Sequence, residues 1–409
     1  MKAVSPRIKE IADRLMAGCK DVVTTEDLIA KLTQAEAEHR PLRIKYGIDA
    51  SGPDIHLGFA IGLQKMRQFQ DYGHTAVPVV GDFTGKIGDP SGRSKTRPQL
   101  TDEQVSVNMA RYKEQLFKIL KPEQTEITYN SHWSDPLTAR EVIALAAKLT
   151  LARIIEREDF KNRLSQGLPL GLHELLYPLF QAYDSVAVRA DVELGGQDQY
   201  WNLLVGRDLQ RESGQAPQVI MTVPLLEGLD GKLKMSKSYD NYVGIAEPPK
   251  EIYGKIMSLP DAMILRYFEL AAFWPAEKRQ DVEAGLKRGD NPRDWKDRLA
   301  REIVARYYSP ADADRAAQEF DAVFRQHQPP AEMPEYVLTT RRALVDIIIA
   351  TGLLPSKSEA RRKFTEGAIY LNGERASDPA LELEPGDPVI LKIGKRKFCR
   401  IVRNQKLES

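Results

Sequence analysis

A histidine and a glycine stand where a strand pattern gives way to a helix pattern, in the segment DIHLGF at residues 54–59. The N-terminus of a helix offers free N–H groups and the positive end of the helix dipole, which suit the phosphates of a nucleotide. Gly58 permits close approach of a flat ring or ribose, and His56 can donate to a phosphate oxygen as charge develops. Because His-x-Gly triplets are common, this motif indicates a function only together with others.

A second motif, KMSKS at residues 234–238, follows a strand pattern and is expected in a loop. Lys234 and Lys237 are three residues apart, so both can turn onto one polyphosphate. Alone, such a run is usually a solvated basic loop. It stands 178 residues after the His-x-Gly element, and the pair favours a shared nucleotide site over the solvated loop.

A third group of polar side chains lies in YPLFQAYDS, residues 177–185. Tyr177, Gln181 and Asp184 fall at i, i+4 and i+7, so they share one helix face. Polar groups on an otherwise buried stripe are costly unless they hold something polar. The pattern favours a polar ligand, and the alternative is a buried polar network without one.

The elements that must position these motifs alternate between strand and helix. Apolar residues at period 2 predict a strand over 42–48, followed by a helix pattern over 55–72 and a strand over 76–80. This βαβ order predicts an α/β fold with a doubly wound parallel sheet. Residues 81–98 lack periodicity, which predicts a long loop at the carboxyl end of a strand, where such sheets bind ligands.

Further along the chain, helices are predicted over 138–164 and from 249 to about 324, and strands over 187–194 and 219–226. The end of the chain reads as a short helix pair, starting near Ser356 or Ser358, with a small sheet that includes an Asn-Gly hairpin. The expected domains are 1–225 with the sheet and a helical insertion, 226–328 with the KMSKS loop and helices, a linker at 329–340, and a small α+β domain at 341–409.

Composition and charge limit the function classes. The 409 residues suggest two or three domains, and 59 Lys+Arg against 58 Asp+Glu exclude global attraction to a polyanion. Residues 341–409 hold 14 Lys/Arg against 9 Asp/Glu, a net +5, which suggests contact with a phosphate backbone or simply a solubilising tail. Two isolated cysteines and no apolar run of 18 residues lead us to expect a cytoplasmic protein that spans no membrane.

The His-x-Gly element and the KMSKS loop together resemble the paired signature of class I aminoacyl-tRNA synthetases. Over almost its whole length the chain resembles the bacterial-type tyrosyl-tRNA synthetases, through GDFTGKIGDPSGRSKTRP (81–98), YPLFQAYDS (177–185), GGQDQ (195–199) and a C-terminal alpha-L-type RNA-binding domain. The resemblance implies a Rossmann-like catalytic sheet, a helical anticodon-side domain and tyrosine–tRNA ligase activity. In that activity ATP converts tyrosine to tyrosyl-adenylate and pyrophosphate, and the tyrosyl group then passes to the 3′-terminal ribose of tRNA(Tyr).

The resemblance also implies roles for single residues. The tyrosine-binding residues would be Asp89, Tyr177, Gln181, Asp184, which accepts from the phenol, and Gln199. The ATP-binding residues would be Gly47, Asp49, His56, Gly58, Gly195, Asp198 and Lys237. The catalytic residues would be His56, Lys234, Lys237, Arg93 and Arg97. Arg361, Arg362 and Lys363 would bind RNA.

The implied chemistry needs no general base, because the tyrosine carboxylate is already a nucleophile. Catalysis would come from alignment and from neutralising charge on the phosphates. ATP is expected as a substrate with Mg²⁺ carried on its phosphates, and no protein-bound metal is expected. The expected partners are tRNA(Tyr), tyrosine, ATP and a second copy of the chain, joined through helical apolar faces between about 106 and 165. Neither DNA nor a membrane is expected.

The chain departs from the family pattern at three places. Phe59 stands where the class usually has a second histidine, and Ala50-Ser51 stand where a proline and a threonine are common. Lys45 occupies the place of a tyrosine that touches the substrate hydroxyl in one branch, and it should point to the opposite strand face from its neighbour Tyr46.

Two questions are open at this stage. The ring of Phe59 could pack on the nucleotide or in the core towards Leu63 and Met66, and mixed packing is favoured. Besides the ligase, the sequence allows an RNA-binding or regulatory paralogue with weak or altered aminoacylation, or the same activation of another aromatic amino acid.

Overall fold

The computed structural model describes residues 4–48, 54–88, 101–324, 333–394 and 397–403. The chain divides into two compact units, the first ending at Ser309 and the second beginning at Pro310. In the ranges described, no helix is both long and apolar enough to cross a membrane.

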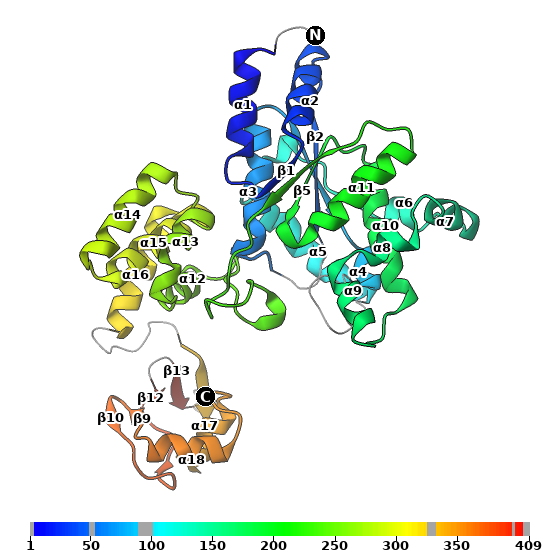
Figure 1. Cartoon of the computed structure of the whole chain (residues 1–409). Helices are drawn as coiled ribbons and strands as arrows, with labels where there is room; N and C mark the ends of the chain where they lie inside the picture. Colours follow the sequence, from blue (N-terminus) through cyan, green and yellow to red (C-terminus); the bar gives the residue numbers. More distant parts are fainter. Residues whose placement is uncertain (1–3, 49–53, 89–100, 325–332, 395–396, 404–409) are drawn as a thin grey trace. The chain divides into compact units, whose positions relative to one another are not determined.

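A mostly parallel sheet forms the centre of the first unit (Figure 1). Its described strands follow the order β1-β6-β5-β2-β3-β4. They are β1 (Asp21–Val23), β2 (Arg43–Ile48), β3 (Thr75–Val80), β4 (Thr128–Tyr129), β5 (Val192–Gly196) and β6 (Val219–Val223). All neighbouring strands pair in parallel except β1, which runs antiparallel at one edge. The doubly wound parallel sheet predicted from the sequence is therefore confirmed.

The strand order reverses between β2 and β5. From β2 the chain moves outward through β3 to β4, and it later returns to place β5 on the other side of β2, followed by β6. Because both crossovers are right-handed in such folds, helices α3 (Leu57–Asp71) and α11 (Tyr200–Glu212) cover opposite faces of the sheet. A reversal of this kind opens a crevice at the carboxyl ends of the two strands, where ligands bind.

Helix α3 lies very close to β2. His56 is its N-cap, and the ring Nδ1 accepts from the backbone N–H of Phe59 at 3.2 Å. Gly62 permits the close packing, because a Cβ at this position would lie 2.4 Å from the ring of Tyr46. The start of the helix is therefore held against the strand that leads to the crevice.

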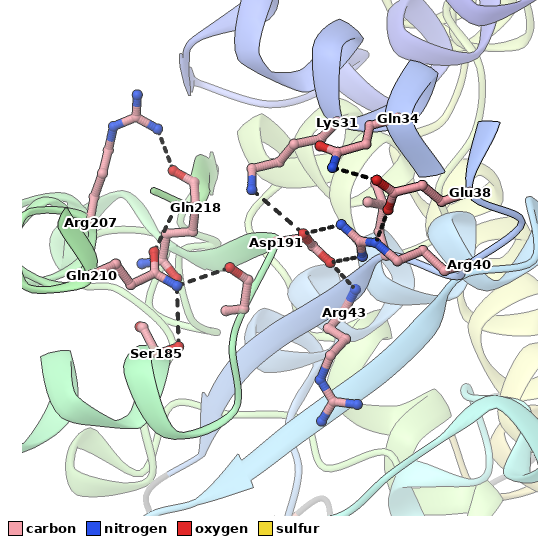
Figure 2. Close-up of polar contacts among 12 residues, drawn as sticks. Lys31, Gln34, Glu38, Arg40, Arg43, Ser185, Asp191, Arg207, Gln210 and Gln218 are labelled. Atoms are coloured by element: carbon pink, nitrogen blue, oxygen red, sulfur yellow. Dashed lines mark hydrogen bonds and ion pairs between the residues drawn. The ribbon is translucent and has the colours of Figure 1, made fainter. Parts of the chain in front are cut away.

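The amino ends of β2 and β5 are joined by a polar cluster around Asp191 (Figure 2). The Asp191 carboxylate accepts two hydrogen bonds from Arg40, at 2.8 and 3.1 Å, and one from the backbone N–H of Arg43 at 3.0 Å. Lys31, from α2 (Thr25–Ala37), lies 3.5 Å from the same carboxylate. Helix α2 is thus attached to the sheet at the amino ends of these strands, opposite the crevice.

The other helices of the first unit surround this sheet or follow it in the chain. Up to the KMSKS loop they are α1 (Pro6–Met16), α4 (Thr84–Ile87), α5 (Asp102–Leu116), α6 (Ser131–Ser134), α7 (Ala139–Ala146), α8 (Leu151–Ile155), α9 (Glu158–Ser165) and α10 (Leu172–Ala187). After it come α12 (Pro249–Met257), α13 (Ile264–Leu270), α14 (Ala276–Arg288) and α15 (Pro292–Tyr307). Short 3₁₀ turns are η1 (Pro122–Gln124), η2 (Gln197–Gln199), η3 (Lys237–Tyr239) and η4 (Asp261–Met263).

Two predicted elements need correction. The single helix predicted over 138–164 is three helices, α7, α8 and α9, because Thr150 accepts from the N–H of Arg153 and so caps a new helix. The strand predicted over 187–194 begins only at Val192, since α10 continues through Ala187. In the predicted loop over 81–98 the structure has the short helix α4, and residues 89–98 lie outside the described ranges.

The second unit begins with α16 (Pro310–Phe324) and contains a small sheet of order β10-β9-β12-β13-β7. Its strands are β7 (Glu335–Leu338), β9 (Ile369–Leu371), β10 (Glu374–Arg375), β12 (Val389–Ile393) and β13 (Lys397–Arg403), while β8 (Arg342–Ala343) pairs with β11 (Glu382–Leu383). Helices α17 (Leu344–Ala350) and α18 (Lys357–Thr365) complete it.

Local signals in the second unit match the prediction. Asn372 and Gly373 both have positive φ, at 48° and 89°, as a tight β9–β10 hairpin requires. Ser356 caps α18 by accepting from the N–H of Glu359. Strand β7 pairs with β13, so the C-terminal sheet begins within the segment 329–340 for which the sequence predicts a linker.

Candidate active site

A cavity of about 250 Å³ opens at the carboxyl ends of β2 and β5, at the point where the strand order reverses. A volume of this size fits an organic ligand rather than a single ion or water. The predicted site residues that line it are Gly47, His56, Gly58, Tyr177, Gln181, Asp184, Gly195, Asp198, Gln199, Lys234 and Lys237. Asp49, Asp89, Arg93 and Arg97 lie outside the described residues.

His56 contributes a neutral ring to this cavity. Burial, then the charges of Lys237 and Lys234, lower the pKa of His56 to about 3. Because Nδ1 accepts from the N–H of Phe59, the proton of the neutral ring is on Nε2. The ring can therefore donate one hydrogen bond without carrying a charge.

The two signature motifs meet at the cavity although they are far apart in the sequence. The backbone N–H of Gly58 contacts Sδ of Met235 at 3.4 Å. Lys234 Nζ lies 2.6 Å from a carboxylate oxygen of Asp198, in η2. Lys237 Nζ donates to the hydroxyl of Tyr112, on α5, at 2.5 Å. The two lysines of the loop thus contact different walls of the cavity.

Asn241 holds the backbone of the KMSKS loop through hydrogen bonds. Its Oδ1 accepts from the backbone N–H of Ser236 at 2.9 Å, and its Nδ2 donates to Asp230 at 2.6 Å. Asp230 also accepts from the N–H groups of Lys232 and Leu233. These bonds fix the backbone of the loop from which Lys234 and Lys237 reach the cavity.

Asp184 lies at the buried end of the cavity, on α10. Its carboxylate accepts from Trp133 Nε1 at 2.9 Å and from Asn130 Nδ2 at 3.3 Å. Burial raises the pKa of Asp184 to about 7, against the lowering effect of Lys45 and of these two hydrogen bonds. Nearby, the side-chain oxygen of Gln181 is buried and has no hydrogen-bond partner among the residues that the structure describes. The buried end therefore offers two acceptors that a polar ligand can use.

Comparisons with known proteins agree with this geometry. Residues 37–325 match the model of the class I tRNA synthetases for tryptophan and tyrosine, and residues 325–401 match that of the C-terminal domain of tyrosine–tRNA ligases. The chain is 52% identical to a tyrosine–tRNA ligase of Moorella thermoacetica, over 95% of this chain and 94% of that protein. The chain belongs to the tyrosine–tRNA ligases.

Other relatives support the same family. A tyrosine–tRNA ligase of Nitrosomonas europaea is 49% identical over 97% of each chain. Among solved structures, a truncated mitochondrial tyrosyl-tRNA synthetase of Aspergillus nidulans is 21% identical with a TM-score of 0.63, covering 78% of this chain and 94% of that one. The Archaeoglobus fulgidus tyrosyl-tRNA synthetase complexed with L-tyrosine is 22% identical, with a TM-score of 0.59, over 76% and 99% of the two chains. At these identities the structures show a shared fold.

Phe59, the residue that departs from the class I pattern, packs on β2. Its ring stacks on that of Tyr46 with centroids 4.8 Å apart, and both rings line the cavity. Tyr46 was not among the packing partners that the sequence suggested, because the contact joins a helix to a strand. Lys45 points to the other face of β2, towards α10, as expected from strand alternation.

This member of the tyrosine–tRNA ligases has site residues that sequence reasoning missed. Tyr112, Asn130, Trp133 and Glu193 contact or line the site from α5, from the segment after β4 and from β5. Asn130 and Trp133 follow directly after the carboxyl end of a strand in the sheet, which is the signal that could have indicated them. Glu193 is a charged residue in a strand that is otherwise apolar or glycine, which is also an informative exception.

The basic triplet of the C-terminal domain lies on α18. Arg361 and Arg362 are exposed and Lys363 is half-buried. Arg362 pairs loosely with Glu366 at 3.5 Å, and Lys363 pairs with it at 2.6 Å. Exposed ion pairs of this kind are weak, so these cations can exchange their partners. Over the ranges that the structure describes, no three His, Cys, Asp or Glu side chains are grouped to hold a metal ion.

Proposed function

We propose that the cavity between β2 and β5 is where this chain activates tyrosine with ATP before transferring it to tRNA(Tyr). The observation that supports this is the composition of one cavity. Its buried end holds Tyr177, Gln181 and Asp184, and its more exposed end holds His56, Lys234 and Lys237. One end suits a phenolic amino acid and the other suits a polyphosphate.

In this proposal the tyrosine ring enters the buried end. Asp184 accepts from the phenol, beside the donors Asn130 and Trp133 that already orient its carboxylate. The buried side-chain oxygen of Gln181 accepts from the ammonium group, together with Tyr177 and Asp89, and Gln199 lies near the substrate carboxylate. Phenylalanine would leave Asp184 desolvated without its partner, which is the basis of selectivity.

ATP occupies the other end. Gly47, Asp49, Gly58 and Gly195 meet the adenosine side, and Asp198 accepts from the ribose. The phosphates are held by His56, Lys234, Lys237, Arg93 and Arg97, with Mg²⁺ carried in on ATP. A neutral His56 with its proton on Nε2 acts as a hydrogen-bond donor there, and the lysines supply the positive charge.

The reaction is an in-line displacement. A carboxylate oxygen of tyrosine bonds to the α-phosphorus of ATP while the bond to the pyrophosphate oxygen breaks, and tyrosyl-adenylate stays bound. A ribose hydroxyl of the tRNA terminus then attacks the tyrosyl carbonyl, and AMP leaves. Neither step needs a side-chain nucleophile, so the residues act by alignment and by stabilising charge.

The C-terminal domain would hold the tRNA. Arg361 and Arg362 are exposed on α18 and, with Lys363, suit phosphates on a structured RNA. A tRNA substrate also fits a cytoplasmic location. Filter binding of tRNA to the triple variant with these three residues changed to glutamine tests the assignment, and unchanged affinity would contradict it.

A homodimer is also part of the proposal. Large apolar side chains are exposed between α7 and the start of α10, with exposed fractions of 70% for Ile143, 61% for Leu151 and 76% for Leu172. Large apolar side chains that are exposed in one protomer can be buried in an interface with another. This region continues the helical faces over 106–165 that the sequence suggests. Sedimentation at micromolar concentration should give a dimer, and a monomer would contradict the proposal.

The central test is tyrosine-dependent exchange of pyrophosphate into ATP. The full chain should catalyse exchange with tyrosine and far less with tryptophan or phenylalanine, and it should charge tRNA(Tyr). Absence of exchange with every amino acid, in protein that still binds tRNA, would overturn the proposal.

A further inference from the structure

A buried ion pair lies directly behind the tyrosine end of the cavity. Lys45 Nζ on β2 is 2.7 Å from a carboxylate oxygen of Glu193 on β5, and the exposed fractions of the two side chains are 0% and 2%. Glu193 lines the cavity beside Asp184. Burying an ion pair costs desolvation energy that hydrophobic residues of similar size would avoid. Its presence at this position therefore calls for a role beyond stability.

Lys45 also binds the helix that presents Asp184. Its ammonium group donates to the backbone carbonyl of Gln181 at 3.0 Å and to the hydroxyl of Ser185 at 2.8 Å. Together with Glu193 these groups give the ammonium group three partners. Each of its three N–H donors therefore has a partner within the protein. Lys45 is therefore not a direct partner for the substrate hydroxyl.

Glu193 and Ser185 close this network. The Ser185 hydroxyl donates to Glu193 at 3.0 Å, and the side-chain amide of Gln218 donates to the same carboxylate. The backbone carbonyl of Ser185 accepts from Gln210, as Figure 2 shows. One turn of α10, from Gln181 to Ser185, is thus held from the sheet side, while Asn130 and Trp133 hold the Asp184 carboxylate itself.

We infer that Lys45, paired with Glu193, is a positioning residue that sets the selectivity of the site for a hydroxylated ring. Lys45 fixes the turn of α10 that carries Gln181 and Asp184, and its ammonium group forms its direct ion pair with Glu193. This inference rests on the proposed function, because it concerns the amino acid bound in the same cavity.

The variants that test it separate positioning from stability. Lys45→Met leaves Glu193 buried without its cation, so both folding and selectivity should suffer. The pair Lys45→Met with Glu193→Gln removes both charges and keeps an acceptor for Ser185 and Gln218. Lys65→Met is a matched control, since Lys65 is also buried and donates to the carbonyls of Leu15 and Ala17, at 2.9 and 2.7 Å, on α1 and at its C-cap.

The measurements are thermal unfolding, exchange kinetics with tyrosine and phenylalanine, and calorimetric binding of both amino acids. Lys45→Met should lower the unfolding midpoint and reduce the tyrosine-to-phenylalanine ratio of kcat/KM by at least about 10-fold, mainly through the KM for tyrosine. The double variant should regain stability and keep the reduced ratio. Lys65→Met should lose stability at an unchanged ratio.

Several results would overturn the inference. A double variant with the wild-type ratio would show that the ion pair is only structural, and so would a Lys65→Met protein whose ratio falls as far as that of Lys45→Met. If Lys45→Met and the double variant do not fold, Ser185→Ala replaces them, because it removes only the hydroxyl that bonds both Lys45 and Glu193. An unchanged ratio in Ser185→Ala would then count against the inference.

The binding data keep this inference separate from the proposed function. Wild-type protein that binds tyrosine selectively and shows no exchange would overturn the proposed catalysis while the Lys45 variants still test selectivity. Wild-type protein that exchanges with tyrosine while every variant keeps the wild-type ratio would overturn the inference alone.

Discussion

Lys234 Nζ and the carboxylate of Asp198 are 2.6 Å apart, so an ion pair joins the KMSKS loop to the turn that follows β5. Both side chains are partly exposed, with exposed fractions of 41% and 25%, which keeps the pair weak. In the proposed reaction these same two groups meet different parts of ATP, the phosphates and the ribose. Binding of ATP would therefore exchange this pair for two contacts with the nucleotide.

Substitutions at the pair should be modestly non-additive. Lys234→Met should lower kcat for exchange by roughly 100-fold, because a charged contact with the departing pyrophosphate is lost. Asp198→Asn should instead raise the KM for ATP. Since the two residues touch, the double variant should lose less than the product of the single losses. Exchange kinetics at varied ATP measure this, and strictly multiplicative losses would contradict the coupling.

The two roles of His56, helix cap and hydrogen-bond donor, can be separated by two substitutions. His56→Asn keeps a good N-cap acceptor for α3, whereas His56→Ala removes it and should cost about 1 kcal/mol of stability. Both variants lose the Nε2–H donor, so both should reduce the exchange rate to a similar extent. Chemical denaturation of the two variants measures their stability, and exchange assays measure their activity. A fully active His56→Asn would show that the ring serves the helix alone.

Asp184 should make the protein less stable as the pH rises from about 4 to about 7. Its pKa of about 7 in the folded chain lies above the ordinary value of 3.8, so in this window the folded state keeps a proton that the unfolded state releases. Asp184→Asn lacks this effect. Between pH 4 and pH 8 the difference in unfolding free energy between the variant and wild type should therefore shift in favour of the variant by up to about 4 kcal/mol. Denaturation at several pH values measures the difference.

The same Asp184→Asn variant should discriminate less well against phenylalanine. The amide keeps the shape of the carboxylate and forms a weaker hydrogen bond with the phenol, so the tyrosine-to-phenylalanine ratio should fall by about 10-fold or more. Turnover at saturating tyrosine should change less than the ratio. A ratio equal to that of wild type would mean that another group recognises the hydroxyl.

Phe59→His should speed up adenylate formation several-fold while hardly changing the affinity for tyrosine. The ring of Phe59 has no donor, and a hydrogen bond gained in the transition state is worth on the order of 1 kcal/mol. Phe59→Leu is the control, because it removes the stacking on Tyr46 without adding a donor. Single-turnover kinetics with ATP and tyrosine measure the step. A large loss of stability with no kinetic gain would show that Phe59 is structural.

Removal of the chain from residue 334 onward should spare exchange and impair the charging of tRNA. The cut lies just before β7, which pairs with β13 and so belongs to the C-terminal sheet. The described cavity-lining residues all precede Asp240. Exchange and aminoacylation assays on the shortened chain check this, and equal loss of both activities would contradict a separable role for the C-terminal domain.

The fold could be predicted from local signals where those signals are strong. The period-2 pattern before Gly47 and the helix pattern from residue 55 correctly indicated β2 and α3. The break of the 138–164 helix at Thr150 was missed, because a capping threonine is hard to distinguish from an ordinary helix residue within an apolar pattern. Likewise, the bonds from Asn130 and Trp133 to Asp184 span more than fifty residues and leave no periodic trace.

The Asp191 cluster has a genetic consequence. It joins the amino ends of β2 and β5, the two strands whose opposite ends form the walls of the cavity (Figure 2). A substitution at Asp191 or Arg40 leaves every residue that lines the cavity unchanged. It removes hydrogen bonds that hold the amino ends of β2 and β5 together. Such alleles should be temperature-sensitive. Cells carrying them would grow normally in the cold and fail on warming, although the altered residues lie at the opposite end of the strands from the cavity.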